Sequence, residues 1–436
     1  MSNGFIKILK EKFSYSDNTK TGELKSSLPS GLSYIVTSIC AAAVFISHYI
    51  YCKDFCVKSL SDLGAHLTFA SEYDLTSGEG FLYSWARVPH LGWHMLVRFF
   101  AALHMPIEEA ASLVYSLLAV FAFIASTYLV YRMIRHYLLR DELLISSLCA
   151  GISCFVGPLA MPWFTPLGIY HGQYSPNPFH NPTHMAVKGF GILLIMLGVD
   201  IFRKVKCEKL IFFKSDKNLY LKFGILLFVS SIFKPTFMYM LLPAGFVFMI
   251  TELCIVLRTK SYPLKNIFSS LIKLIISVIP SIALMIIENI VISKYGDPTA
   301  ITVFSFSKPF EVWHLYTLSV PNSILLAMLF PIVICILNPG YFLKSTEGRL
   351  SVISYFVGVF EFSFLKDAGY QMISANFAWC MMSGMVVLYI FTIAKLAIET
   401  LREGRNTGHM ISICTCWFIL LLHGFSGISF MLERPM

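Results

Sequence analysis

The chain has 436 residues, of which 56% are hydrophobic and only 14% are charged, and its mean hydropathy is +0.69. A soluble domain carries roughly a quarter of charged residues, so this composition excludes a soluble globular protein. The net charge of +9 does not indicate nucleic-acid binding, because the Lys and Arg residues lie in short segments between apolar runs.

The first 30 residues are polar and basic, and they precede the first apolar run at 31–51. A secretory signal peptide has a shorter basic region and a cleavage site of small residues after its apolar stretch. Neither feature is found here. We therefore expect 1–30 to be a cytoplasmic tail and the first apolar run to remain as a membrane span.

Long apolar runs follow one another along the rest of the chain. A helix needs about 17 to 25 apolar residues to cross the core of a bilayer. Eleven runs approach this length: 31–51, 109–131, 142–161, 184–202, 219–236, 237–257, 266–292, 320–338, 350–365, 375–396 and 409–430. They predict an all-α polytopic membrane protein with about 11 transmembrane helices (range roughly 10–13). Residues 31–436 then form a single transmembrane domain.

A twelfth run, at 89–104, is shorter and carries His90, His94, Arg98 and His104. These polar residues predict an amphipathic helix at the membrane surface rather than a span. Basic residues test this arrangement, since they concentrate on the cytoplasmic side of a membrane. With eleven spans and a cytoplasmic N-terminus, 22 of the 34 Lys and Arg fall on the cytoplasmic side. The C-terminus is then outer, and so are the segments 52–108 and 162–183.

The first outer segment, 52–108, contains Asp62 and His66, which are four residues apart and share one face of a helix. A carboxylate near an imidazole can act as a general base, and either group can bind a metal. An exposed helix with two polar residues on its wet side would give the same spacing. Arg87 and His90 follow among several aromatic residues, either as anchors in an aromatic belt or as substrate contacts.

The second outer segment, 162–183, carries five prolines together with His180 and Asn181. Proline at this density prevents a helix and fixes an irregular path. Irregular backbone at membrane depth persists only when protein surrounds it or when it lines a cavity. We therefore expect an ordered loop that faces the same cavity as Asp62, although a stiff lid without a chemical role would share these features.

The outer histidines raise the question of a metal. The spacing H-x-x-x-H occurs at His90/His94 and at His180/His184, but Pro182 interrupts the second pair. Neither pair belongs to an H-E-x-x-H zinc motif. We expect no cofactor, and leave a divalent metal as the alternative.

Lys234 precedes Pro235 near the outer end of the predicted span 219–236. A charge within a span is costly and is usually functional, so its ammonium is a candidate for binding the phosphate of a lipid carrier. Snorkelling of the side chain to the interface is an equal alternative. Asn376, in the segment before the next-to-last run, is a further candidate for substrate binding.

Several of these segments together resemble a known family. D-L-G-A-H-L-T-F-A (62–70) and V-P-H-L-G-W-H (88–94) resemble the first outer loop of the GT-C superfamily, polytopic glycosyltransferases that use polyprenyl-phosphate-linked sugars. Poorly characterised bacterial members have counterparts, in the same order, of S-P-N-P-F-H-N-P-T, K-P-T-F, A-N-F-A-W and H-G-F-S-G-I-S-F. The resemblance covers about 31–430. It implies a GT-C-like fold in a bacterial cell membrane.

By this resemblance, Asp62 matches the acidic residue that the superfamily uses for catalysis, and His66 matches the polar position beside it. Many relatives carry a second acid directly after the first, where this chain has Leu63. The resemblance therefore does not extend to a two-carboxylate metal site. The proposed roles of Arg87, His90, His180, Asn181, Lys234 and Asn376 in substrate binding come from their chemistry alone.

The expected function is transfer of a sugar from a polyprenyl-phosphate donor to a cell-surface glycan or a lipid-linked acceptor. The expected partners are the donor, the acceptor and membrane lipids, with no nucleic acid. Two rivals stay open. One is a transporter or flippase for a lipid-linked or small polar substrate, which the lack of an internal repeat disfavours. The other is a glycan polymerase or ligase with the same chemistry and a different acceptor.

Overall fold

The computed structural model of the chain describes residues 31–58, 62–88, 90–159, 174–296, 302–368, 372 and 374–432. These residues form fifteen α-helices, one 3-10 turn and a two-stranded sheet. The proposed tail 1–30 and the part of the second outer segment at 162–173 lie outside them. The prediction of an all-α protein is confirmed.

Eight helices are long and apolar enough to cross a bilayer, counting the described residues alone. They are α2 (Gly31–Lys58), α6 (Ile107–Leu138), α8 (Pro182–Val205), α10 (Thr236–Thr259), α11 (Leu264–Tyr295), α12 (Val320–Leu337), α15 (Ala378–Leu401) and α16 (Thr407–Leu432). This is the make-up of an integral, multi-pass membrane protein.

The other predicted runs also form helices, but these differ from the eight. α7 (Leu143–Ser153) and α9 (Leu219–Phe233) are apolar but shorter, and α14 (Thr346–Phe364) carries three charged residues. At 1.5 Å per residue, α7 is about 17 Å long, roughly half the thickness of a bilayer core. A helix therefore lies on each of the eleven runs, while the count of about eleven spans stays a prediction.

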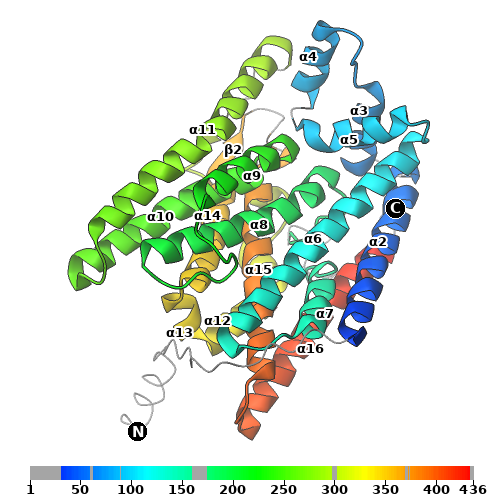
Figure 1. Cartoon of the computed structure of the whole chain (residues 1–436). Coiled ribbons are helices and arrows are strands. Elements are labelled where there is room, and N and C mark those ends of the chain that lie inside the picture. The colour runs from blue at the N-terminus through cyan, green and yellow to red at the C-terminus, as the bar shows by residue number, and fades with distance from the viewer. Residues whose placement is uncertain are drawn as a thin grey trace.

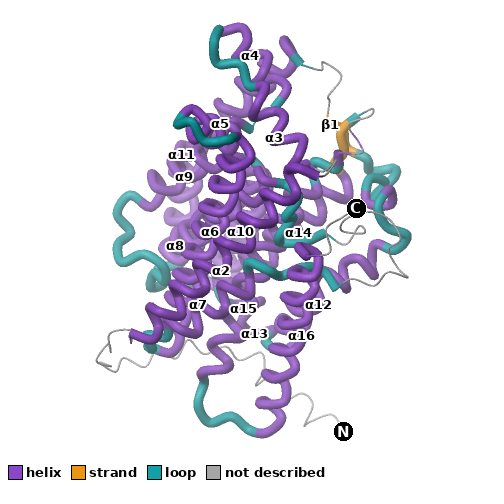
Figure 2. Tube along the Cα trace, turned by 90° about the vertical axis from the view of Figure 1, so that its right-hand side faces the viewer, coloured by secondary structure: helices purple, strands orange, loops and turns teal. Residues whose placement is uncertain are grey.

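Helices were predicted in the first outer segment, and its described residues contain three short ones: α3 (Asp62–Glu72), α4 (Gly78–Arg87) and α5 (Leu91–Ala102). α5 coincides with the run at 89–104, and its 12 residues make it about 18 Å long. This length is too short to span a bilayer core of about 30 Å. Figures 1 and 2 place α3, α4 and α5 together at one end of the helix bundle.

The opposite end of the bundle holds α13 (Pro339–Lys344) and the connection from α15 to α16 (Figures 1 and 2). Ion pairs join the predicted cytoplasmic segments there. Arg140 Nη2 lies 2.5 Å from Glu403, and Arg203 Nη1 lies 3.1 Å from Glu347. Segments predicted to share a side of the membrane thus lie together. The assignment of this end to the cytoplasm stays a prediction.

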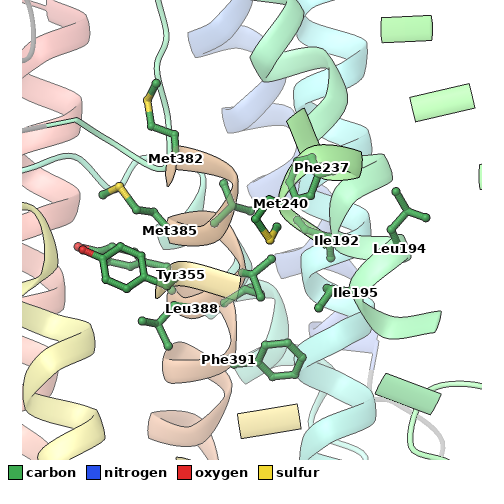
Figure 3. Close-up of a cluster of buried hydrophobic side chains, with 14 of the residues drawn as sticks. Ile192, Leu194, Ile195, Phe237, Met240, Tyr355, Met382, Met385, Leu388 and Phe391 are labelled. Atoms are coloured by element: carbon green, nitrogen blue, oxygen red, sulfur yellow. The ribbon is translucent and has the colours of Figure 1, made fainter. Parts of the chain in front are cut away.

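The core is built around α8 and α15, which are buried along most of their length. Side chains of α8, α10, α14 and α15 form the cluster drawn in Figure 3, which includes Ile192, Met240, Tyr355 and Phe391. α2, α11 and α16 lie at the edge of the bundle (Figure 1). Exposed isoleucines follow one face of α11 at helical spacing, which suits contact with lipid: Ile272, Ile276, Ile279, Ile286 and Ile290.

Candidate functional site

Asp62 is the first residue of α3, at the end of the bundle that also holds α4 and α5. A carboxylate in the first turn of a helix is stabilised by the positive end of the helix dipole. The Asp62 side chain is 47% exposed, so solvent or a substrate can reach it. It is therefore a surface carboxylate that other groups must orient.

The segment 174–181, which leads into α8, is irregular and almost fully buried. Asn177 ties it to the end of α7, where the last carbonyls of a helix lack partners within the helix. Its Nδ2 donates to Ser153 O at 2.9 Å and to Val156 O at 2.8 Å. Lys188 of α8, itself buried, donates to Asn177 Oδ1. The expected ordered loop is thus confirmed for its described part, where protein surrounds the backbone.

α16 holds the other side of this region through the sequence H-G-F-S-G. The His423 ring nitrogen Nδ1 lies 2.7 Å from Gly157 O, and Gly157 N donates to His423 O at 2.9 Å. Ser426 Oγ donates to Pro158 O at 2.5 Å. A Cβ on Gly427 would lie 1.8 Å from Phe155 O. The motif therefore fastens the backbone that follows α7, and its glycine allows the close approach.

Gly427→Ala is expected to destabilise the protein by about 1–3 kcal/mol, because the added methyl group collides with backbone that a side-chain rotation cannot move. Thermal unfolding of the purified protein in nanodiscs measures the effect. Gly424→Ala is the matched control three residues earlier, since its Cβ would meet its nearest atom at 3.6 Å. Equal unfolding temperatures for the two variants would contradict the close packing at Gly427.

Asn181 connects this segment to Asp62. It caps the N-terminus of α8, where its Oδ1 accepts from His184 N at 2.9 Å. Its Nδ2 donates to Asp62 Oδ2 at 3.0 Å. The orientation of the amide follows from these partners, because only Nδ2 can donate to the carboxylate and only Oδ1 can accept from the backbone. One side chain thus begins a helix and orients the candidate base.

Lys234 lies behind Asn181, in the break between α9 and α10 that Pro235 creates. Its Nζ donates to Asn181 Oδ1 at 3.1 Å and to Thr183 Oγ1 at 3.2 Å. The ammonium also lies 4.0 Å from the ring centroid of Trp379, within cation–π range. Lys234 is only 5% exposed. The Lys234 side chain is thus buried and holds Asn181 against Asp62, and it does not snorkel.

His180 is the second neighbour of Asp62, with its Nε2 3.7 Å from Asp62 Oδ2. This distance confirms the prediction that the loop carrying His180 lies beside Asp62. Burial is the main cause that lowers the pKa of His180 to about 4, so the imidazole is neutral near pH 7. The rings of His180 and His184 both pack against Trp379, with centroids 5.9 and 5.4 Å away.

The spacing of His66 suggested Asp62 as its partner, but the ring of His66 bonds to His94 instead. Its Nδ1 lies 3.0 Å from His94 Nε2, and His94 Nδ1 lies 3.0 Å from His90 O. Since a carbonyl can only accept, His94 donates from Nδ1, and His66 donates to its Nε2. Burial lowers the pKa of His94 to about 4 and that of His90 to about 3, so both rings are neutral.

Acid is expected to destabilise the protein through these buried imidazoles. The pKa of His90 is about 3 in the fold and about 6.5 in the unfolded chain, so the unfolded chain binds more protons between these values. The contribution of the neutral His90 ring to the free energy of unfolding is therefore fully present above pH 6.5, and it is lost as the pH drops toward 3. From pH 6.5 to 4.5 the wild type should lose about 2 kcal/mol more than His90→Gln in chemical unfolding. Equal losses would contradict a neutral His90.

Two predicted residues are engaged elsewhere. Arg87 Nη1 lies 2.7 Å from Glu72 Oε2 in an ion pair with both side chains about half exposed. Asn376 Nδ2 donates to Asp367 Oδ2 at 2.7 Å on the exposed rim of the small sheet. The structure joins His180, Asn181 and Lys234 to Asp62, whereas Arg87 and Asn376 form local contacts of their own. Their proposed role in substrate binding stays a prediction.

Three residues in this region were not predicted to belong to it. Thr183 Oγ1 donates to Asn181 Oδ1 at 2.9 Å. Trp379, which closes the A-N-F-A-W motif, packs on Lys234, His180 and His184. Tyr316 follows the first strand of the small sheet, and burial together with the negative charge of Asp62 raises the pKa of its phenol. The signal for Trp379 was its place in that motif, three residues after Asn376.

No three His, Cys, Asp or Glu side chains converge on a point suited to an ion, within the part of the chain that the structure describes. His66 and His94 use their facing nitrogens for a hydrogen bond to each other. Among the described residues, the site therefore offers a half-exposed carboxylate, neutral imidazoles and a buried lysine. No protein-family model and no curated protein matches the chain.

Proposed function

We propose that the protein is a GT-C-type membrane glycosyltransferase that transfers a sugar from a polyprenyl-phosphate donor to a cell-surface glycan or a lipid-linked acceptor. In this proposal the α3–α5 end of the bundle faces the outside of a bacterial cell membrane, and the N-terminus is cytoplasmic. Nucleotide sugars are confined to the cytosol. An enzyme that acts on the outer face therefore needs a donor that is carried in the bilayer.

The observation that supports this most is the orientation of Asp62. The carboxylate is reachable, yet one of its oxygens is fixed by Asn181 Nδ2 at 3.0 Å, and Asn181 is itself fixed by the N-terminus of α8 and by Lys234. A general base must be held within hydrogen-bond reach of the proton that it removes. The second oxygen of Asp62, Oδ1, is the atom we assign to this task.

The reaction that we propose inverts the anomeric carbon of the sugar. Asp62 takes the proton of an acceptor hydroxyl as the hydroxyl oxygen forms a bond to the anomeric carbon. The bond between that carbon and the phosphate oxygen breaks, and polyprenyl phosphate leaves with the electron pair. Proton, bonds and charge balance without a metal or a redox partner.

Lys234 supplies positive charge to this region from a buried position. A charge in a low-dielectric environment acts over a longer distance than in water, so the ammonium favours a phosphate beside Asn181 and Thr183. Its hydrogen bonds to both side chains fix their orientation at the same time. We therefore assign Lys234 two effects, attraction of the donor phosphate and alignment of Asn181.

The proposal can be tested without knowing the sugar, by comparing the surface glycans of cells with and without the gene. Deletion of the gene is expected to remove one sugar from a surface glycan, as measured by mass spectrometry of released glycans. Wild-type protein should restore it, and Asp62→Asn, at equal membrane abundance, should not. An unchanged glycan in the deletion strain, or restoration by Asp62→Asn, would overturn the assignment.

A flippase for a lipid-linked substrate is the second candidate. The break at Lys234 and Pro235 between two apolar helices resembles the broken helices that bind ions or substrates in transporters. A flippase would leave an un-flipped, chemically complete glycolipid in the deletion strain. A transferase would leave a glycan that lacks one sugar, so the same mass spectra separate the two.

A further inference from the structure

A surface cavity of about 520 Å³ lies at the end of the bundle opposite to α3, α4 and α5 (Figures 1 and 2). Its walls come from Arg140, which follows α6, and from the connection between α15 and α16. Gly404 turns that connection with a φ of 71°, and a Cβ built on it would meet no atom within 4 Å. The cavity is therefore open, and a ligand can reach its walls.

Arginine dominates the charge of this cavity. Arg140, Arg402 and Arg405 line it together with one acid, Glu403, so the lining carries a net charge of +2. Arg140 Nη2 lies 2.5 Å from Glu403 Oε1, and this ion pair neutralises one of the three arginines. The other two guanidinium groups supply the excess positive charge.

The protein itself neutralises Arg402 and Arg405 only weakly. Arg402 Nη1 lies 3.7 Å from Glu399 Oε2, which is beyond hydrogen-bond distance, and the Arg402 side chain is 65% exposed. Glu399 accepts a hydrogen bond from Lys395. Arg405 has no carboxylate partner among the residues that the structure describes. Two arginines thus line one cavity without an acid that balances them, and an anion would complete the site.

An apolar face of α16 begins at the same cavity. Met410, in the first turn of α16, lines the cavity and is exposed. Because α16 is long enough to cross a bilayer and lies at the edge of the bundle, an exposed apolar face on it suits contact with acyl chains. Exposed apolar side chains continue along the helix from Met410 at helical spacing: Ile411, Phe418, Leu421, Leu422 and Phe425.

We propose that the cavity binds the phosphate headgroup of an anionic phospholipid whose acyl chains lie along this face of α16. A guanidinium group presents paired N–H donors that match two oxygens of a phosphate. Basic pockets on the cytoplasmic side of membrane proteins bind anionic headgroups, and this end of the bundle is the one proposed to face the cytoplasm. A free phosphate would use the arginines alone, whereas a phospholipid uses both the cavity and the apolar face. The inference does not depend on the proposed sugar transfer.

Native mass spectrometry of the full-length protein, released from detergent micelles, counts bound lipids and measures their affinity. The probes are dioleoyl phosphatidylglycerol, which is anionic, and dioleoyl phosphatidylcholine, which has the same chains and a zwitterionic headgroup. We expect the first molecule of phosphatidylglycerol to bind more tightly than the first molecule of phosphatidylcholine. Arg402→Gln combined with Arg405→Gln should weaken phosphatidylglycerol binding roughly 30-fold, the equivalent of about 2 kcal/mol, because two cations beside the phosphate are lost.

Arg258→Gln combined with Lys265→Gln is the matched control. Both residues are exposed, and they flank the connection from α10 to α11, which is also predicted to be cytoplasmic and does not line the cavity. This variant removes the same charge and should bind phosphatidylglycerol like the wild type. Equal weakening in the two double variants would indicate diffuse attraction and overturn the site. Equal affinity of the two lipids for the wild type would overturn it without any substitution.

Glycerol 3-phosphate, the headgroup fragment without acyl chains, separates a lipid from a soluble phosphate ester. We expect phosphatidylglycerol to stay bound when glycerol 3-phosphate is added at an equal concentration, because the fragment gains nothing from the apolar face of α16. Displacement of the lipid by the fragment would assign the cavity to a soluble phosphate compound and overturn the lipid assignment.

Discussion

Asp62→Asn is expected to lower the rate of sugar transfer by about 10²–10⁴-fold while the protein folds normally. The amide has nearly the same shape as the carboxylate, and Asp62 is 47% exposed, so the change creates no packing defect. The amide oxygen can still accept from Asn181 Nδ2, which preserves the contact to α8. What is lost is the capacity to take the proton of the acceptor.

Two further variants make this expectation specific. Asp62→Glu moves the carboxylate by about 1 Å or more, and a displacement of that size costs on the order of 10²-fold in rate. Asp74→Asn is the control, because Asp74 lies at the same end of the bundle, is not buried and has a side chain that accepts hydrogen bonds from the neighbouring Thr76. It should transfer sugar at the wild-type rate. Transfer by purified Asp62→Asn close to that of Asp74→Asn would end the assignment of Asp62 as the base.

The sequence predicted the helices because their signal is local. Each apolar run of sufficient length became a helix. The run at 89–104 is shorter and contains polar residues, and it forms the short helix α5. The end of α7 is the main difference. The run 142–161 continued in the sequence, but the helix stops at Ser153, and Asn177 and α16 hold the backbone that follows. Those partners are distant in the chain, so a local pattern gives no sign of them.

In the candidate site, too, the local sequence identified single residues but not the contacts between distant segments. Asp62, His180, Asn181 and Lys234 were each identified by residue type and neighbours, and the structure brings them together. Their connections were not predicted, because Asn181 and Asp62 are 119 residues apart and Lys234 reaches Asn181 across 53 residues. The spacing of Asp62 and His66 placed them on one face of a helix. In the structure, however, Asp62 bonds to the start of α8, whereas His66 bonds to α5. Trp379 and Tyr316 enter through packing of whole segments, for which the sequence has no periodic signal.

Lys234→Met is expected to raise the apparent KM for the donor by roughly 10- to 100-fold before it lowers kcat. Hydrogen bonds to a charged group contribute about 1.5–3 kcal/mol, which corresponds to this range of affinity. Methionine is unbranched and one atom shorter than lysine, so it can fill most of the same space in the break between α9 and α10. The loss is the positive charge near Asn181 and Thr183, and a loss of ground-state binding shows first in KM.

Lys188→Met is the matched control for this change, because Lys188 is also a buried lysine and belongs to α8. Its Nζ donates to Asn177 Oδ1, away from Asp62, and fixes the loop to the end of α7. Its loss should lower the unfolding temperature and leave the KM of the folded fraction near that of the wild type. Steady-state kinetics over a range of donor concentrations distinguishes the two lysines. If Lys234→Met and Lys188→Met changed stability alike and left KM alike, Lys234 would be a structural cation with no part in donor binding.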